Sequence, residues 1–320
     1  MSVLVCGEML YDVFADRRTG VSEDRPAGGG FSLDARIGGS ALNVAAGLAR
    51  LGVPVAQLTG VSTDVFGAQL TAFLEAEGVE TRYLKRTAAP TTLAMVMPGP
   101  DGSAAYTFYG EGAADRQVEL ADLPSLGGVD ALVFGCFSLL TRPTGDSFLE
   151  LARRAKAASP APVVVLDPNV RLAVEPDPAV WRRRIGEFAA FADLVKLSRE
   201  DLETVYADAP EAQPAAWLRD GATAVIVTDG PRGARWWSAA GTVDVSAPKV
   251  SVVDTVGAGD SFLAALMAGL AERGMLTAAG LSSLAAAEAR DVLAFAVKAA
   301  ALTCTRRGAD LPRRADLATG

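Results

Sequence analysis

Two glycines and two acidic residues stand close together in the stretch VDTVGAGDSF, residues 253–262. Apolar residues recur at positions 262, 266 and 270, a spacing that predicts a helix beginning near Gly259. The first turn of a helix has unpaired N–H groups and a partial positive charge, which suit an anion. Because glycine has no Cβ, the backbone at Gly257 and Gly259 can approach such an anion closely, and the amide of Ala258 lies between them. The sequence therefore predicts a phosphate-sized anion site with Asp260 at its edge.

The glycine turn at residues 257–260 allows other interpretations. Asp260 could simply cap the helix, because aspartate is favoured in the first turn. A dinucleotide-binding G-x-G-x-x-G fingerprint fails because Phe262 occupies the place of its third glycine, and the motif lies late in the chain. No G-x-x-x-x-G-K-[ST] phosphate loop occurs anywhere in the sequence.

The chain contains no histidine, which limits the chemistry available to it. Ser-His-Asp and Cys-His catalysis, histidine-ligated metals and histidine-based pH sensing are all excluded. The three scattered cysteines, Cys6, Cys136 and Cys304, are too few for a cysteine-ligated zinc site. Any general base must be Asp, Glu, Lys or Tyr.

Composition points to a globular protein that binds neither nucleic acid nor membrane. The 320 residues favour one large domain with an appendage, and the net charge of −8 disfavours nucleic acid or anionic lipid as a partner. The longest apolar run, residues 131–140, is too short to cross a bilayer, and the N-terminus lacks the pattern of a signal peptide. Isolated free cysteines are typical of a cytoplasmic protein.

Apolar, β-branched runs alternate with helical patterns along the chain, which predicts an α/β fold with a doubly wound, mostly parallel sheet flanked by helices. The expected strands are residues 3–7, 55–62, 130–135, 161–167, 192–198 and 222–229. The expected helices are residues 40–52, 65–78, 144–158, 178–191, 199–206 and 212–219, followed by an almost wholly helical segment, 259–304.

Two regions, at about residues 9–37 and 91–113, do not follow this alternation of strands and helices. The second alternates as a hairpin, with Asp101 and Gly102 as its turn signal. We expect both regions to form one small β-sheet outside the main domain. Its functional interpretation is a lid over a site, the alternatives are a dimerisation edge or simple decoration, and a lid can also be a dimer contact.

Two motifs resemble signatures of the ribokinase-like (PfkB) family of carbohydrate kinases. They are GGSALNVAAGLARLG at 38–52 and DTVGAGDSF at 254–262. Six further blocks resemble the family in the same order: GEMLYD (7–12), TGVSTDVFG (59–67), TFYGEGAADR (107–116), DPNVR (167–171), VKLSREDLE (195–203) and VTDGPRGA (227–234). AADR and DPNVR look most like the fructokinase branch. The resemblance implies a single ribokinase-like domain over residues 1–320.

The resemblance also implies roles for particular residues. Asp260 would be the general base that takes a proton from a sugar hydroxyl, while the amides of Gly257, Ala258 and Gly259 hold the transferred phosphoryl group. The residues that would contact the sugar are Asp12, Gly38, Gly39, Asn43, Arg116 and Arg171. Plain structural roles remain open: a strand-end turn for Asp12, a first-turn position for Asn43, and ordinary ion pairs for the two arginines.

The nucleotide and ions would lie on the other side of Asp260. The residues implied for ATP are Ser198, Thr228, Gly230, Gly233, Gly259 and Val297. The glycines could instead form a plain strand-to-hairpin turn. The family's N-x-x-E motif reads Ser198-x-x-Asp201 here, so Asp201 would be an indirect Mg²⁺ partner. A K⁺ ion would be ligated by carbonyls of Asp254, Val256, Thr303, Arg306 and Gly308.

The resulting functional hypothesis is an ATP-dependent sugar kinase, with fructose as the first choice of substrate. 2-Keto-3-deoxygluconate, ribose or a nucleoside would keep the same chemistry. A non-catalytic sugar-binding protein is disfavoured because Asp260 and both glycines are present. A nucleotide-dependent oxidoreductase is disfavoured because the dinucleotide fingerprint is missing.

Overall fold

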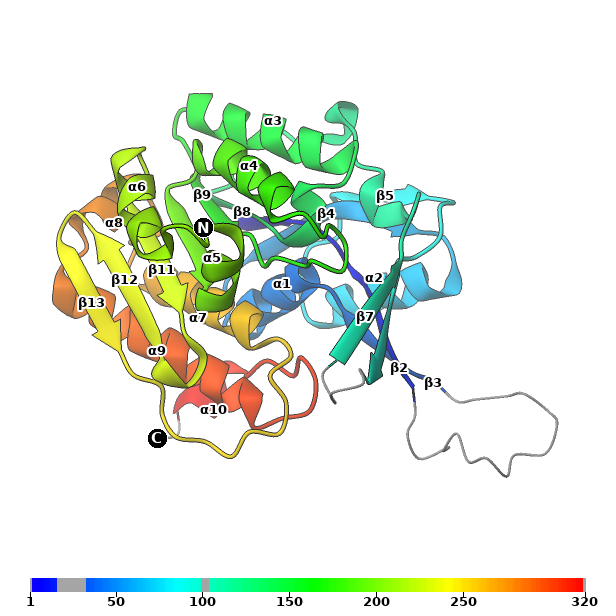
Figure 1. The fold of residues 1–320 in the computed structure, drawn as a ribbon. Coiled ribbons are helices and arrows are strands. Elements are labelled where there is room, and N and C mark those ends of the chain that lie inside the picture. Colours follow the sequence, from blue (N-terminus) through cyan, green and yellow to red (C-terminus); the bar gives the residue numbers. More distant parts are fainter. Residues whose placement is uncertain (1, 16–32, 99–103, 319–320) are drawn as a thin grey trace.

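The computed structural model describes residues 2–15, 33–98 and 104–318, and its main feature is a large twisted sheet (Figure 1). The strand order in this sheet is β13 (Gly241–Val245), β12 (Ala234–Ser238), β11 (Ala224–Thr228), β10 (Leu194–Ser198), β9 (Val163–Asp167), β8 (Ala131–Gly135), β1 (Val3–Cys6), β4 (Val55–Ser62) and β5 (Leu84–Thr87). From β5 to β11 neighbouring strands are parallel, whereas β12 and β13 form an antiparallel hairpin at the edge.

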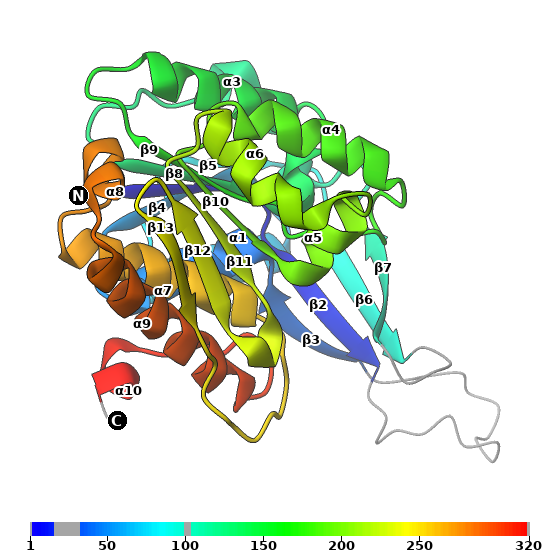
Figure 2. The same ribbon diagram turned by 60° about the vertical axis from the view of Figure 1, so that its left-hand side comes forward.

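Helices cover both faces of the sheet (Figures 1 and 2). One face carries α1 (Ser40–Arg50), α2 (Val65–Ala76), α7 (Ala258–Glu272) and α9 (Ala286–Cys304), with α8 (Ala278–Ser283) and α10 (Arg314–Ala318) nearby. The other face carries α3 (Thr144–Ala157), α4 (Pro178–Ala189), α5 (Arg199–Val205) and α6 (Gln213–Arg219). Short 3-10 turns lie at Ala114–Arg116, Leu120–Asp122, Cys136–Leu139, Pro210–Ala212 and Gly230–Arg232. No helix within the described residues is long and apolar enough to span a membrane.

Each face of the sheet has its own apolar core, because strands covered on both sides bury every side chain. All four residues of β1 and all five of β9 are buried. One core fills the space under α1, α7 and α9, and the other lies under α3 and α4. This two-sided burial explains why the strands read as continuous apolar runs in the sequence.

A second, four-stranded sheet extends from one side of the body, in the order β3 (Leu33–Gly38), β2 (Leu10–Ala15), β6 (Leu93–Pro98) and β7 (Ala104–Tyr109) (Figure 1). The two regions that broke the α/β rhythm therefore do form one sheet. Residues 16–32 of the first region, and the expected turn at Asp101 and Gly102, lie outside the described residues.

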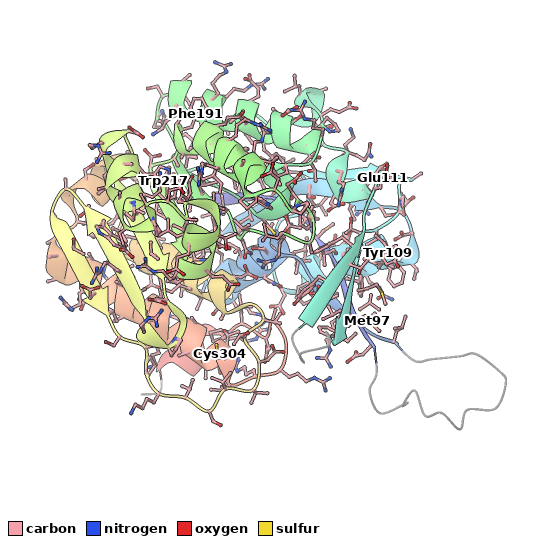
Figure 3. All side chains as sticks on the ribbon, viewed as in Figure 1. Met97, Tyr109, Glu111, Phe191, Trp217 and Cys304 are labelled. Carbon is pink, nitrogen blue, oxygen red and sulfur yellow. The ribbon has the colours of Figure 1, made fainter. Side chains whose placement is uncertain are left out.

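The pairing register separates two faces of this second sheet, because directly paired residues share a face. On the inner face, Asp12 pairs with Ala94, which pairs with Phe108, and the Phe108 ring contacts Phe137 of the main body at 5.5 Å between centroids. The outer face is rich in apolar residues. Leu33, Met97 and Tyr109 on this face are exposed (Figure 3 labels the last two).

The expected fold class, a doubly wound, mostly parallel α/β sheet with a small second sheet, is confirmed. The strand predicted at 55–62 has those bounds, and the other predicted elements differ by a few residues at their ends. Four strands and helices were missed: β5, the strands β12 and β13 of the edge hairpin, and α10. Strand β5 is short and polar, and the hairpin turns at Ala239 and Ala240, which carry no Asn-Gly or Asp-Gly signal.

Candidate active site

The predicted site residues gather at the carboxyl ends of the parallel strands, where open α/β sheets bind their ligands. Of the predicted residues, Ser198 and Thr228 end β10 and β11, and Arg171 follows β9. Glu8 after β1 and Asn169 after β9, which were not predicted, lie at the same edge of the sheet. The N-terminal ends of α1 and α7 meet here, because Asp260 of α7 is hydrogen-bonded to two residues of α1.

The glycine turn forms the N-terminus of α7, as expected. Gly257 is the N-cap, with φ 76°, and a Cβ on it would lie 2.7 Å from Ala309 Cβ, so glycine is required. No side chain caps this helix end. The Ala258 amide, however, donates to the Thr255 carbonyl at 3.2 Å. It is therefore not free for an anion, and the site has one amide donor fewer than predicted. The amides of Gly259 and Asp260 occupy first-turn positions that have no intrahelical acceptor.

Asp260 is not a helix cap, which rules out the alternative weighed above. Its carboxylate leaves its own helix and accepts a hydrogen bond from Ser40 Oγ at 2.7 Å (Oδ1) and another from Asn43 Nδ2 at 2.8 Å (Oδ2). The residue is only 6% exposed. Asn43 is therefore more than a first-turn residue of α1: it orients the predicted base.

Asp12 lies in the middle of β2, so it does not belong to a strand-end turn. A Cβ on Gly38 would lie 2.1 Å from Asp12 Oδ2, so this glycine makes room for the carboxylate. Gly39 has φ 106°, and a Cβ there would lie 2.8 Å from the Glu8 carbonyl oxygen. Burial raises the pKa of Asp12 to about 6. The positive charge of Arg171 opposes this rise, and the carboxylates of Asp260 and Glu8 add to it.

Neither predicted arginine makes an ion pair with another of the described residues, so no ordinary ion pair is found for either within that part of the chain. Arg171 Nη1 donates to the Val170 carbonyl at 2.9 Å, and its charge acts on Asp12. The Arg116 guanidinium lies 5.5 Å from the centroid of the Phe137 ring, and its Nε has no partner in the described structure. Both side chains therefore retain donors for a ligand.

A buried ion pair beside the glycine turn was missed in the sequence. Lys196 Nζ contacts Asp167 Oδ2 at 2.7 Å, with side-chain exposures of 5% and 4%. A Cβ on Gly259 would lie 3.2 Å from Lys196 Nζ, which places this ammonium group at the predicted anion site. Burial raises the pKa of Asp167 to about 6, against the effect of Lys196. The signal was a lysine in the middle of an apolar strand, LVKLS.

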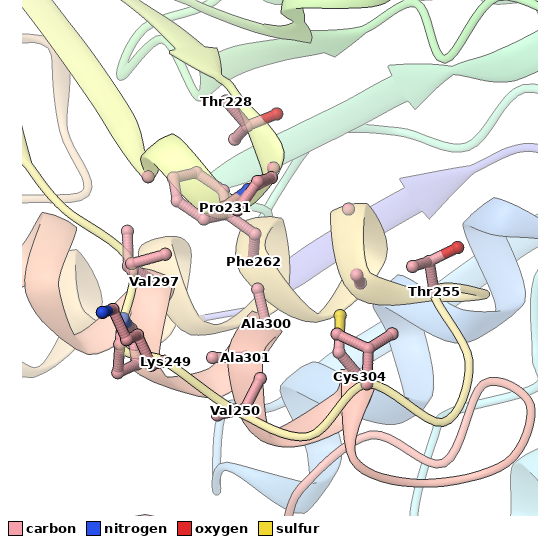
Figure 4. A pocket seen from close by; sticks show the side chains of 17 residues that line it. Thr228, Pro231, Lys249, Val250, Thr255, Phe262, Val297, Ala300, Ala301 and Cys304 are labelled. Carbon is pink, nitrogen blue, oxygen red and sulfur yellow. The ribbon is translucent and has the colours of Figure 1, made fainter.

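A cavity of about 550 Å³ opens on the other side of the glycine turn (Figure 4). Thr228, Gly230, Gly233, Gly259 and Val297 all line it, as predicted for a nucleotide site. Its remaining lining is mostly apolar: Pro231, Ala247, Pro248, Lys249, Val250, Val252, Thr255, Ala258, Phe262, Ala300, Ala301 and Cys304. Such a lining suits a flat base.

Two residues in this lining add to the sequence predictions. Gly233 also has a structural role, because its φ is 98° and a Cβ would lie 2.0 Å from the Val245 carbonyl of the hairpin. Gly233 therefore both forms the turn from β11 into the hairpin and lines the cavity. Cys304 is half-buried and faces the cavity, unlike the fully buried Cys6 and Cys136.

Ser198 and Asp201 lie apart from this cavity. Ser198 caps α5 by accepting from the Asp201 amide at 3.0 Å, and it lines an adjoining groove with Thr228 and Gly230. Asp201 is close enough to Asp167 to help raise its pKa. Within residues 2–15, 33–98 and 104–318, no cluster of three or more Asp, Glu, Cys or His is arranged to hold a metal.

The five residues predicted to ligate K⁺ come from two segments that lie side by side: the loop before α7, and the C-terminal end of α9 with the loop after it. Asp254 joins them, because its carboxylate accepts from the Val256 amide at 3.1 Å and from the Gly308 amide at 2.8 Å. The Thr303 carbonyl already accepts from the Arg306 amide at 2.9 Å. The structure thus brings the predicted positions together.

Comparison with known proteins identifies the family. Residues 1–316 match the pfkB family of carbohydrate kinases. The chain belongs to this family of phosphotransferases. A fructokinase from Rhizobium leguminosarum bv. trifolii is 39% identical over 284 residues, which cover 88% of this chain and 83% of the relative.

Solved structures of pfkB proteins share the fold. A fructokinase from Xylella fastidiosa with bound ATP has a TM-score of 0.84 and 28% identity, covering 96% of this chain and 93% of its own. A fructokinase double mutant from Vibrio cholerae O395, with fructose, ADP and a potassium ion bound, has a TM-score of 0.83 and 25% identity, covering 99% and 97%. The ribokinase-like α/β fold inferred from the sequence is therefore confirmed.

Proposed function

We propose that this pfkB protein phosphorylates fructose with ATP, and that Asp260 is its general base. The observation that carries the proposal is the position of Asp260. Its carboxylate is hydrogen-bonded to α1 beside the Asp12 side of the site, while its own helix begins at the edge of the nucleotide-sized cavity. A hydroxyl held near Asp12 would therefore meet a phosphate at the α7 N-terminus.

In the proposed reaction, the oxygen of a sugar hydroxyl attacks the γ-phosphorus of ATP, and the bond from that phosphorus to the ADP oxygen breaks. Asp260 takes the hydroxyl proton. The amides of Gly259 and Asp260, together with Lys196, stabilise the negative charge on the transferred group. ATP supplies the phosphoryl group, and a bound Mg²⁺ would supply positive charge against its phosphates. The sugar would be held by Asp12, Asn43, Arg116 and Arg171, with Gly38 and Gly39 allowing close approach.

The described residues offer supporting features for the ions, but no preformed side-chain cage is found among them. Asp201, near the Asp167–Lys196 pair, would reach Mg²⁺ indirectly, and the phosphates would supply most of its ligands. Ser198, as the cap of α5, would act mainly through the shape of that groove. The loops around Asp254 and Gly308 would bind K⁺ through carbonyl oxygens; the V. cholerae relative has such an ion bound.

We also propose that residues 1–320 form one ribokinase-like domain in which the second sheet, from about 9–37 and 91–113, is a lid subdomain. Its apolar outer face, with exposed Leu33, Met97 and Tyr109, suits a homodimer contact with a second copy. Tyr109→Glu should then shift the protein from dimer to monomer in light scattering; a wild-type monomer at high concentration would contradict this. The free cysteines suit a cytoplasmic location.

The test is an assay of ADP release with ATP and Mg²⁺ against D-fructose, 2-keto-3-deoxygluconate, D-ribose, D-glucose, tagatose and adenosine. We expect the highest kcat/KM with fructose. A preference for 2-keto-3-deoxygluconate or ribose would keep the chemistry and replace the substrate. If a folded protein that binds ATP releases no ADP with any compound of this panel, a non-catalytic sugar-binding protein is favoured.

A further inference from the structure

Asp260 belongs to a hydrogen-bonded chain with three other residues, two from α1 and one from the segment after β9. The Oγ of Ser40, at the start of α1, lies 2.7 Å from Asp260 Oδ1. Asn169, after β9, contacts the same Ser40 Oγ through its Nδ2 at 2.8 Å. Asn43 holds the other carboxylate oxygen. Neither Ser40 nor Asn169 had been selected from the sequence, although both lie in motifs that resemble the family.

The chemistry of these groups fixes the direction of each hydrogen bond. The Asn169 amide nitrogen can only donate, so Ser40 Oγ is its acceptor. An ionised carboxylate can only accept, so the Ser40 hydroxyl proton points at Asp260. Removing Asn169 would free that hydroxyl to rotate away, while removing Ser40 would release the carboxylate itself.

The backbone of Ser40 is anchored independently. Ser40 is the first residue of α1, and the N-cap, Gly39, has no side chain to offer the helix end. Glu8 supplies the missing acceptor, because its Oε1 accepts from the Ser40 amide at 3.1 Å. The other oxygen of this fully buried carboxylate accepts from Ser138 Oγ at 2.6 Å. The cap is thus provided by a different element, which fixes Ser40 against the end of β1.

Asn169 has an uncommon backbone conformation. Its φ is 42°, in the left-handed region that residues other than glycine seldom occupy, although asparagine tolerates it better than most. Such a conformation persists only where the surroundings hold it. Here it accompanies a side-chain amide that lies within hydrogen-bond distance of Ser40.

We propose that Ser40 is a positioning residue for the general base and that Asn169 acts through it, by directing the Ser40 hydroxyl at Asp260. The inference rests on the proposed role of Asp260. The two hydrogen bonds to Asp260 occupy two of its roughly four acceptor positions and leave the others for a sugar hydroxyl. A base held in this way needs no reorientation when the hydroxyl arrives.

The test compares Ser40→Ala, Asn169→Gly and the double variant in steady-state kinetics with fructose and ATP. Glycine at position 169 accepts the positive φ and removes the whole side chain, including the amide that contacts Ser40. The matched control is Ser261→Ala, because Ser261 Oγ is buried next to Asp260 in the sequence and has no hydrogen-bond partner among the described residues. Melting temperatures are measured for every variant.

We expect Ser40→Ala to lower kcat roughly 10- to 100-fold, with KM for either substrate changed less than about threefold. Asn169→Gly should have a smaller effect. The double variant should be no worse than Ser40→Ala, because one residue acts through the other. Ser40→Thr, which keeps the hydroxyl, should recover most of the loss, and Ser261→Ala should stay within about twofold of wild type. If Ser40→Ala does not fold, Ser40→Cys carries the same expectation.

Three outcomes would overturn the proposal. A raised KM for fructose at unchanged kcat would make Ser40 a sugar ligand, and wild-type kinetics would give it no role. Additive losses in the double variant would show that Asn169 acts elsewhere. Asp260→Asn, measured alongside, separates failure of the proposed base from failure of the positioning role. If Asp260→Asn retains turnover, Asp260 is not the base. If Asp260→Asn loses turnover but the Ser40 and Asn169 variants do not, only the positioning role is wrong.

Discussion

At the scale of single residues, we expect Asp12 to make sugar binding sensitive to pH. Burial raises its pKa to about 6, so the free protein carries a neutral Asp12 below that pH and an ionised one above it. An ionised carboxylate accepts hydrogen bonds from two sugar hydroxyls, whereas a protonated one loses an acceptor position. Sugar binding should therefore weaken as the pH falls through about 6.

We predict that KM for fructose rises roughly tenfold between pH 7 and pH 5, while Asp12→Asn gives a high KM that does not change with pH. The Asp12→Asn variant is the internal control, because Asp167 at the proposed phosphate site also has a pKa raised to about 6 and can make the KM for ATP depend on pH. Steady-state kinetics over this range decide the point. An equal pH dependence of the fructose KM in Asp12→Asn would assign the titration to another group, such as Asp167.

At the scale of elements, two neighbouring parallel strands supply the buried pair at the anion site. Lys196 of β10 and Asp167 at the end of β9 are almost fully buried, and Lys196 approaches Gly259 at the α7 N-terminus. Breaking such a pair leaves an uncompensated buried charge, whereas replacing both partners with apolar residues can be nearly neutral. Stability and phosphate binding can therefore be separated.

We expect Lys196→Met to lower the free energy of unfolding by about 3 kcal/mol, and Lys196→Met with Asp167→Leu to restore it to within about 1 kcal/mol. The double variant should nevertheless lose at least roughly 100-fold in kcat/KM for ATP, because the phosphoryl group loses its cation. Urea unfolding and kinetics give the two readouts. A double variant that is both stable and active would contradict the proposed role of Lys196 at the phosphate site.

At the scale of the whole molecule, the sequence predicted the architecture better than the contacts within the site. The buried strands were found because their apolar runs are local signals, while the β12–β13 hairpin was missed because its two alanines give no turn signal. The cavity lining around Thr228, Gly230 and Gly233 was predicted from motif blocks.

The contacts that orient these motifs were not predictable in the same way. Ser40 and Asp260 are 220 positions apart, and Asn169 and Ser40 are 129 apart. No local pattern records that two helix ends will meet. Lys196 alone left a local signal, as a charged residue within an apolar strand.

The most direct test of this account is the turnover of Asp260→Asn with ATP and fructose, measured together with fructose affinity by calorimetry. We predict that kcat falls by roughly 10²- to 10⁴-fold while the Kd for fructose and the melting temperature remain close to wild type, because the variant keeps the shape of the site and loses the base. Near wild-type turnover in a folded Asp260→Asn protein would contradict the account.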